Sequence, residues 1–342
     1  MSRLRILTLF LVLVALVATL AACGGGSGSD DPQAVVDDAT LQGIESGDVD
    51  LSLGIDVEGE KAGNVDVSLS GPFQSESEAE LPELDMVARA DGSIDGEKID
   101  FDGGLTLLGN KAYVQYEGTE YEVDPTTLSF VKSMLKEQGG GQSQSSEGNA
   151  CQEALGELNP GDFIDQAKSD GSADVGGTET TKVSGDLDAS AALDALTELS
   201  EDPACSERLG SAAPLPSAGE LDKAKGQVQD SVKAAHVDLY VGDDDIVRRI
   251  SLQATIEPPE GSGDDGVKSV ELDLDLILTG VNEDQTISAP QGARPLSQLF
   301  LKLGVNPIEL LGLLQGEGGG FGGGAGGLGG LLEGLGSSGS TQ

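Results

Sequence analysis

The chain has 342 residues, a formal net charge of −41 at pH 7 and only 3% aromatic residues, with no tryptophan. This charge excludes nucleic acid as a partner, because a phosphate backbone requires a basic face. It also argues against a protein drawn flat onto anionic lipid headgroups, and it favours an acidic, solvated surface.

The N-terminal segment has the pattern of a bacterial lipoprotein signal. Arg3 and Arg5 precede an apolar run over residues 6–20, which suits a signal peptide and is short for a spanning helix. The run closes on Leu20-Ala21-Ala22-Cys23, which has the form of a lipobox, and a Gly/Ser spacer follows. We predict lipidation of Cys23 by acyl groups such as palmitate, with the mature chain anchored on the extracytoplasmic face of the cell membrane. The alternative is an ordinary secretory signal with a chance cysteine.

Composition divides the chain into four segments. We expect a lipoprotein signal peptide over 1–22, a Gly/Ser linker over 23–31, a single folded domain over 32–290, and short apolar helices with a Gly-rich tail over 291–342. The tail has the composition of a disordered segment.

Two cysteines remain beyond the anchor. Cys151 and Cys205 form an even pair in an oxidising compartment, so we predict a disulfide between them, worth roughly 4 kcal/mol in the chain-entropy model. A zinc site is not expected, because two distant cysteines and one histidine cannot supply four ligands. No other metal and no cofactor is expected.

Alternating apolar and polar residues predict an antiparallel sheet in the first half of the folded domain. Apolar residues at helical spacing first predict a helix over Pro32–Glu45. The period then changes to two, and tight turns such as Gly109-Asn110 separate the segments, which is typical of a meander. The predicted strands cover residues 49–57, 65–69, 84–90, 99–108, 111–115 and 119–123.

The second half mixes predicted helices with further strands. Ser217 and Glu220 form a capping box for one of the helices. Helices are predicted over residues 126–136, 151–158, 161–168, 189–199, 217–234, 296–303 and 308–314. Strands are predicted over residues 174–188, 236–241, 246–256 and 268–279.

This order of elements resembles the actinobacterial lipoproteins of the LppX/LprAFG family, over roughly residues 32–290. Three stretches carry the resemblance. They are Val49-Asp50-Leu51-Ser52-Leu53, the stretch from Gly109-Asn110-Lys111-Ala112-Tyr113-Val114 through Tyr121-Glu122-Val123-Asp124-Pro125, and Gly177-Thr178-Glu179-Thr180-Thr181-Lys182-Val183-Ser184-Gly185 followed by a helix.

The resemblance implies an α+β fold, in which a curved antiparallel half-barrel sheet has helices over its concave face. It also implies an apolar cavity that holds lipid acyl chains, and a role in carrying lipid or glycolipid in the cell envelope. No binding residue can be carried over, because no binding motif matches residue by residue.

The candidate chemical groups favour a protein that is not an enzyme. His236 is the only histidine and lacks a nucleophile-elbow serine, so we expect it to begin a strand. Asp243-Asp244-Asp245 predicts a solvated hairpin tip rather than a calcium site. Asp91, Asp95, Asp100 and Asp102 are interpreted in the same way. The hypothesis is therefore a lipid-binding envelope lipoprotein, and the alternative is a structural or protein-interaction lipoprotein without a ligand cavity.

Overall fold

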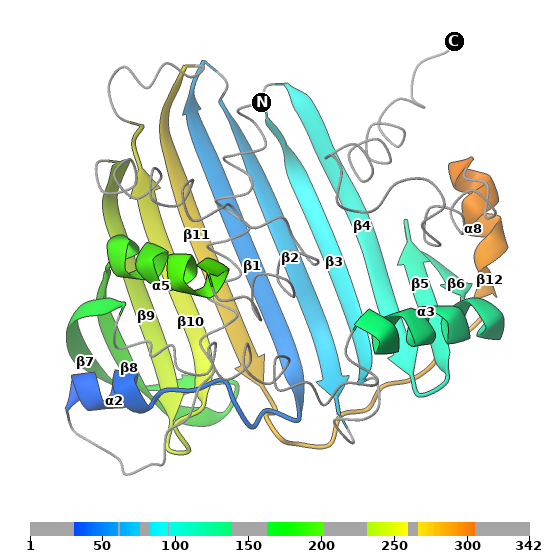
Figure 1. Ribbon diagram of the computed structural model, residues 1–342, viewed down its shortest axis with the longest axis horizontal. Coiled ribbons are helices and arrows are strands. Elements are labelled where there is room, and N and C mark those ends of the chain that lie inside the picture. The colour runs from blue at the N-terminus through cyan, green and yellow to red at the C-terminus, as the bar shows by residue number, and fades with distance from the viewer. Residues whose placement is uncertain are drawn as a thin grey trace.

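Two β-meanders meet edge to edge and form one twelve-stranded sheet (Figure 1). In a computed structural model, residues 31–60, 62–75, 82–94, 96–138, 163–201, 231–258 and 266–304 are described. The strands are β1 (Ser46–Gly59), β2 (Gly63–Gln74), β3 (Glu83–Ile94), β4 (Glu97–Leu108), β5 (Lys111–Tyr116), β6 (Thr119–Glu122), β7 (Ile164–Val175), β8 (Thr178–Leu187), β9 (Val232–Gly242), β10 (Val247–Ile256), β11 (Val267–Thr279) and β12 (Arg294–Pro295). The described helices are α2 (Pro32–Asp38), α3 (Pro125–Gln138), α5 (Ala189–Glu201) and α8 (Leu296–Leu303).

The strand order is β12-β6-β5-β4-β3-β2-β1-β11-β10-β9-β8-β7. Each meander is antiparallel, and the long antiparallel pair β1–β11 joins them, with Leu53 opposite Leu274. β12 adds a short parallel strand at the edge beside β6. The predicted α+β fold with a large antiparallel sheet is confirmed.

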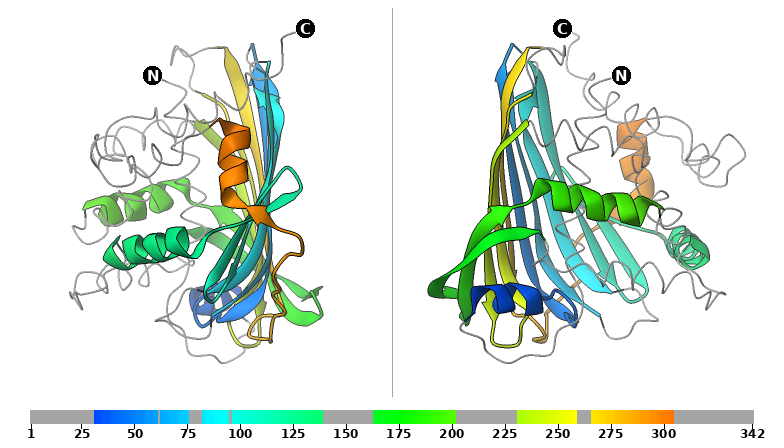
Figure 2. Two further views of the ribbon diagram at one scale, coloured as in Figure 1. Left: turned by 90° about the vertical axis from the view of Figure 1, so that its right-hand side faces the viewer. Right: turned by 60° about the vertical axis from the view of Figure 1, so that its left-hand side comes forward.

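One face of the sheet, here called the inner face, carries the apolar side chains and faces the helices. α2 packs on it over β7 and β8, and α8 packs on it over β6 at the opposite end. α3 and α5 lie on the same side and extend away from the sheet instead of lying flat on it (Figure 2). The other face, here called the outer face, carries mainly Asp and Ser on the long strands.

The main core lies between α2 and one end of the sheet. Val36 and Ala39 are fully buried against strands β8 to β11. The buried members of this core are Val36, Ala39, Ile164, Val183, Val237, Leu239, Val241, Val247, Ile250, Leu252 and Leu274. On β9 and β10, the core residues Val237, Leu239 and Val241 and the pair Ile250 and Leu252 follow the predicted period of two, whereas Val247 precedes a bulge in β10.

Four predicted elements differ from the structure. The helix predicted over 217–234 does not extend to Ala234, because strand β9 begins at Val232; its residues 217–230 lie outside the described residues, as do the helices predicted over 151–158 and 308–314. The first helix ends at Asp38, because Thr40 leaves it to form a parallel bridge with Ile246. The segment 161–168 predicted a helix, but Ile164–Val175 is edge strand β7, which pairs with β8. The strand predicted over 174–188 turns at Gly176-Gly177, so its first residues belong to β7.

The folded body continues beyond residue 290, where the sequence predicted it to end. β12 and α8 lie past that point, and Leu296 and Leu299 of α8 are buried against Tyr121 of β6. None of the helices that the structure describes has the length and apolar composition needed to cross a bilayer.

Candidate functional site

The three cysteines of the sequence-based hypothesis lie outside the described residues. Cys23 precedes residue 31, Cys151 belongs to the connection between α3 and β7, and Cys205 belongs to the connection between α5 and β9. Lipidation of Cys23 and a disulfide between Cys151 and Cys205 therefore stay predictions.

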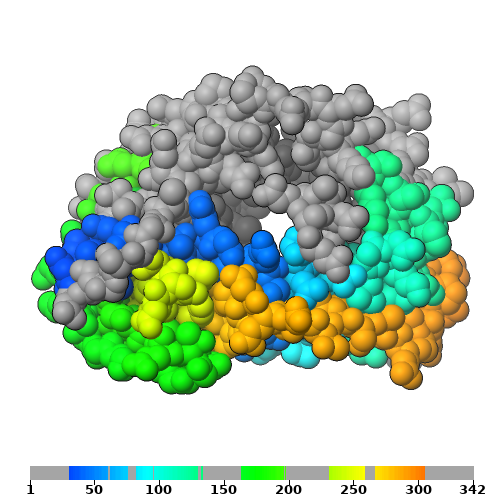
Figure 3. Space-filling view, turned by 90° about the horizontal axis from the view of Figure 1, so that it is seen from below, coloured from blue at the N-terminus to red at the C-terminus, as the bar shows by residue number. Residues whose placement is uncertain are grey.

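The inner face of strands β2 to β4 exposes large apolar side chains. Val67 is 37% exposed, Phe101 41% and Leu105 40%. The register places Val67 of β2 opposite Ala90 of β3, and Ala90 opposite Phe101 of β4, so these residues share one face. Seen along the strands from below, the molecule is hollowed next to β1, β2 and β3 (Figure 3). The apolar face that the alternation predicted is thus only partly covered here.

The same face is filled at the other end of the sheet. Leu239 on β9 is 2% exposed and Ile250 on β10 is 1% exposed, because α2 lies on them. Since one continuous sheet carries both regions, the difference arises from what packs on the face and not from the strands. We call Val67, Leu69, Ala88, Ala90, Phe101 and Leu105 the open patch, after this contrast.

Two capped helices begin on either side of the open patch, α3 after β6 and α5 after β8, with other strands between them and the patch. Asp124 accepts hydrogen bonds from the backbone N–H of Thr126 and Thr127 at the start of α3, and from the Thr127 hydroxyl at 2.6 Å. The hydrogen bond from the Thr127 hydroxyl is the largest of the effects that hold the pKa of the Asp124 carboxyl below its ordinary value, and the backbone hydrogen bonds add to it. Asp188 accepts from the N–H of Ser190 and Ala191 in the same way at the start of α5. The caps fix where each helix leaves the sheet.

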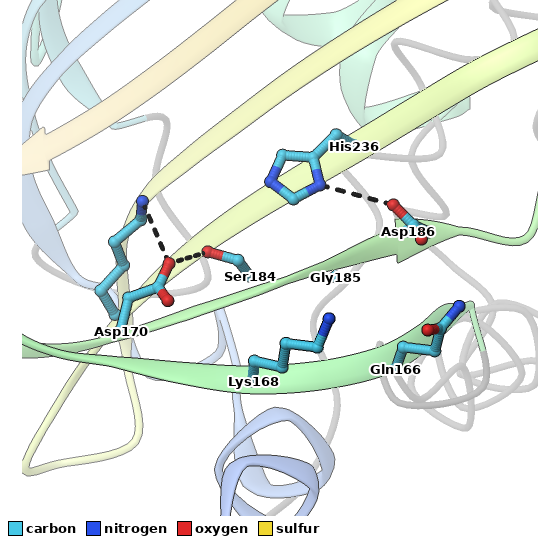
Figure 4. A pocket seen from close by; sticks show the side chains of 8 residues that line it. Gln166, Lys168, Asp170, Ser184, Gly185, Asp186 and His236 are labelled. Carbon is cyan, nitrogen blue, oxygen red and sulfur yellow. Dashed lines mark hydrogen bonds and ion pairs between the residues drawn. The ribbon is translucent and has the colours of Figure 1, made fainter.

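The outer face of β7 to β9 holds a polar pocket of about 270 Å³ (Figure 4). A bulge after Asp165, with Gln166 at φ 57°, displaces β7 from β8 and opens this depression. Its lining residues are Gln166, Lys168, Asp170, Lys182, Ser184, Gly185, Asp186 and His236.

Mutual pairing neutralises most of the charge in this pocket. The Nζ atom of Lys182 lies 3.1 Å from a carboxylate oxygen of Asp238 and 3.5 Å from a carboxylate oxygen of Asp170. The Ser184 hydroxyl is within hydrogen-bond distance of both carboxylates. Burial would raise the pKa of Asp238, but hydrogen bonds from Ser184 and Lys182 outweigh burial and leave this pKa lowered. The hydrogen bond from Ser184 lowers the pKa of Asp170.

His236 lies within β9, not at its start, and points to the outer face. Its Nδ1 is 3.5 Å from Asp186 and its Nε2 is 3.4 Å from Asp238. The Ser184 hydroxyl is directed to carboxylates, so the pair lacks the hydroxyl-to-imidazole hydrogen bond of a Ser/His/Asp triad. The arrangement is that of a salt-bridged strand surface.

The acidic groups singled out in the sequence separate into a turn and a strand surface. Asp243 to Asp245 form the β9–β10 turn, where Asp244 lies 2.7 Å from the guanidinium of Arg248, a side chain only 8% exposed. Burial, with the charges of Asp38 and Asp244, raises the pKa of Asp245. Within the described ranges, no group of three or more His, Cys, Asp or Glu side chains is placed to hold a metal ion.

Asp91, Asp100 and Asp102 lie on strands and not in turns. Asp91 of β3 stands directly opposite Asp100 of β4, and Asp102 pairs with Arg89 at 2.9 Å. Asp95 lies outside the described residues. These carboxylates belong to the outer face, on the opposite side of the sheet from the open patch.

No protein-family model matches the sequence, and no curated protein matches it. Among solved structures, the chain is similar to LprF from Mycobacterium bovis, with 15% identity over 78% of this chain and 100% of the other and a TM-score of 0.33. It is also similar to the lipoprotein LppX from Mycobacterium tuberculosis, with 12% identity over 72% and 91% and a TM-score of 0.24. A putative outer membrane lipoprotein-sorting protein domain from Vibrio parahaemolyticus matches at 7% identity over 68% and 85%, with a TM-score of 0.15. The sequence resembles the LppX/LprAFG family, whose name includes both LppX and LprF.

Proposed function

We propose that the protein is a membrane-anchored, non-enzymatic lipoprotein of the extracytoplasmic face, and that it binds or carries lipid or glycolipid acyl chains between its sheet and its helices. One observation carries this proposal. Val67, Phe101 and Leu105 share one face of adjacent strands and stay 37–41% exposed, whereas the same face is filled under α2.

The energetics favour an apolar occupant for this patch. Apolar surface in water costs about 25 cal/mol per Å², and each methylene of a ligand taken out of water contributes about 0.8 kcal/mol. A patch of exposed side chains on adjacent strands is larger than the singly scattered apolar residues that soluble proteins normally show. Binding of an acyl chain would therefore remove apolar surface from water on both the ligand and the open patch.

The anchor places the protein beside a source of such chains. The lipobox predicts a diacylated Cys23, and two chains are enough for stable membrane attachment. The Gly/Ser linker over residues 24–29 gives the folded body freedom to approach the bilayer surface. A Cys23→Ala variant should move from the membrane fraction to the soluble fraction on cell fractionation, and a variant that stays in the membrane fraction would refute the anchor.

The disulfide is proposed separately. Cys151 and Cys205 belong to the two connections that follow α3 and α5. A bond between them would tie these connections together. Peptide mapping without reductant should return one cross-linked peptide, and two free thiols would refute the pairing.

Lipid binding is tested on protein purified from membranes of its own host. Native mass spectrometry followed by lipid extraction should find acyl lipid bound to the full-length protein. Val67→Asp places a charge in the open patch and should abolish the bound mass. Ser68→Asp, the neighbouring residue on the outer face, is the matched control and should keep it. Lipid-free wild-type protein, or equal lipid in the Val67→Asp variant, would overturn the proposal.

A protein-interaction role is the second candidate, and the outer face favours it. Asp66 stands directly opposite Asp91, and Asp56 directly opposite Glu271. Like charges opposite each other in a sheet are destabilising, by roughly 0.2–1 kcal/mol a pair, so a basic partner would relieve them. Cross-linking on intact cells should capture a partner with wild-type protein and less of it with an Asp56→Asn/Asp91→Asn variant. An unchanged capture would remove this candidate.

A further inference from the structure

The middle strand of the open patch carries unusually small residues on its inner face. Ala88, Ala90 and Gly92 follow one another at the period of two on β3 and share the face of Val67 and Phe101. Ala and Gly are depleted in strands, where β-branched and aromatic residues pack better. A glycine within a strand often marks close approach of a ligand or of another backbone. We call Ala88, Ala90 and Gly92 the lane.

Larger side chains border the lane on both neighbouring strands. On β2, the opposing residues are Leu69, Val67 and Val65. On β4, Phe101 and Ile99 stand opposite Ala90 and Gly92. The lane therefore has an apolar wall on each side and a floor with nothing beyond Cβ.

Two glycines shape the lane, Gly92 in its floor and Gly103 under the wall on β4. At Gly92, φ is 144°, and a Cβ there would lie 2.1 Å from the carbonyl oxygen of Asn64, so this position requires glycine. At Gly103 of β4, a Cβ would lie 2.7 Å from Cζ of Phe101, so the Phe101 ring occupies the space above Gly103. Phe101 thus forms the wall on the β4 side while remaining 41% exposed.

The dimensions of the lane fit one hydrocarbon chain. Neighbouring strands are about 4.8 Å apart, so the walls on β2 and β4 are separated by about 10 Å at the backbone. Carbon atoms pack at about 4 Å, so one chain between two walls needs about 8 Å and two chains abreast need about 12 Å. From Ala88 to Gly92 the lane is about 13 Å long, against about 15 Å for one leaflet of a bilayer core.

We infer that the lane binds one extended acyl chain in single file along β3, and that the small side chains of Ala88 and Ala90 select a slender chain over a fused-ring lipid. This inference rests on the proposed function and adds where the chain lies and what shape it has. The physical reason is that Leu, Ile or Phe at these positions would occupy the space between the walls, whereas Ala leaves it free.

The test uses the full-length, delipidated protein and cis-parinaric acid, a straight-chain fatty acid whose fluorescence rises in an apolar site. Ala90→Leu fills the lane and should weaken binding at least tenfold. Val87→Leu adds one methylene on the outer face of the same strand and should change binding less than twofold. Palmitic acid should displace the probe from wild-type protein, and cholesterol should not.

The outcomes separate this inference from the proposed function. If wild-type protein does not bind the probe at all, the proposed function fails. If wild-type protein binds it and Ala90→Leu binds equally well, or cholesterol competes as well as palmitic acid, the lane is refuted and acyl-chain binding stands.

A diazirine-bearing palmitate gives a readout in wild-type protein that needs no substitution. Its label should map to peptides of β2, β3 or β4, and labelling confined to other peptides would also refute the lane.

Discussion

The inner face of the sheet has a packed half and an open half. Under α2, the side chains of Val183, Leu239 and Ile250 are 1–2% exposed, while Val67 and Leu105 in the middle of the same sheet are 37–40% exposed. Both halves are long antiparallel strands with the same alternation. An alternating strand therefore specifies only which face is apolar. What covers that face is decided by the helices and their connections.

The two halves should also differ in how much they contribute to folding. Truncating a side chain in a filled region costs transfer free energy and leaves a cavity. In a half-exposed region, the same truncation costs little transfer free energy and leaves little or no cavity. The open half is then available for binding, because its stability does not depend on close packing. The proposed binding surface and the main core thus lie on different strands of one sheet.

The largest expected effect comes from truncating matched leucines. Leu239→Ala in the packed half should lower the free energy of unfolding by about 2–5 kcal/mol, since it leaves a cavity in a buried site. Leu105→Ala in the open half should cost less than about 1 kcal/mol, because its side chain is 40% exposed. Urea unfolding of both variants measures the difference. Equal losses would mean that the open half is packed as tightly as the other.

A polar substitution of nearly constant volume gives the next effect. Val183→Thr would bury a hydroxyl in the core and should cost about 1–3 kcal/mol. Val67→Thr leaves the hydroxyl in contact with water and should cost under about 0.5 kcal/mol. The two variants are compared by thermal unfolding with and without bound lipid. A large cost at Val67 in lipid-free protein would contradict an open patch.

The caps of α3 and α5 should have a smaller effect. Asp124→Ala and Asp188→Ala each remove two backbone hydrogen bonds and should cost about 1 kcal/mol of helix stability. Hydrogen exchange should show faster amide exchange in α3 or α5 and unchanged protection in β9 and β10. Loss of protection in β9 and β10 would mean that these helices belong to the packed half.

The smallest effect is a pH dependence on the outer face behind the packed half. The pKa of Asp238 is lower in the folded protein, so its contribution is fully present above the unfolded value of about 3.9 and is lost as pH falls through the folded value. We expect under about 1 kcal/mol. Unfolding measured from pH 6 to pH 2 should show a component that Asp238→Asn removes. A component that survives in this variant must come from other carboxylates.

Most of the strands could be predicted from the sequence, because residues such as Val49 to Val57 alternate without interruption. The caps and turns were also readable, as Asp124-Pro125 before α3 and Gly109-Asn110 between β4 and β5 show. The edge strand β7 could not be predicted. It is mostly polar and interrupted by Gln166 and Gly171 at positive φ, and only pairing with β8 makes it extended.

The candidate site was predictable in character and not in position. The alternation predicted an apolar face, and the resemblance implied that this face is concave. The position of Ala88 and Ala90 could not be predicted to matter, because small residues carry no periodic signal of their own. Their importance follows from cross-strand register, which places them between the walls of β2 and β4. The polar cluster around Lys182 and Asp238 could not be predicted either, because these two residues lie more than fifty positions apart in the sequence.

By itself, the sequence predicted a membrane anchor, and it determined the acidic outer face and the antiparallel alternation. These are local properties: a lipobox, a charge and a period of two can each be read within a few residues. Tertiary structure decided the rest. The pairing of β1 with β11 joins residues more than two hundred positions apart, and the placement of α2 and α8 at opposite ends leaves the middle of the inner face open. Whether an apolar residue is core or binding surface depends on those distant contacts, which no local pattern contains.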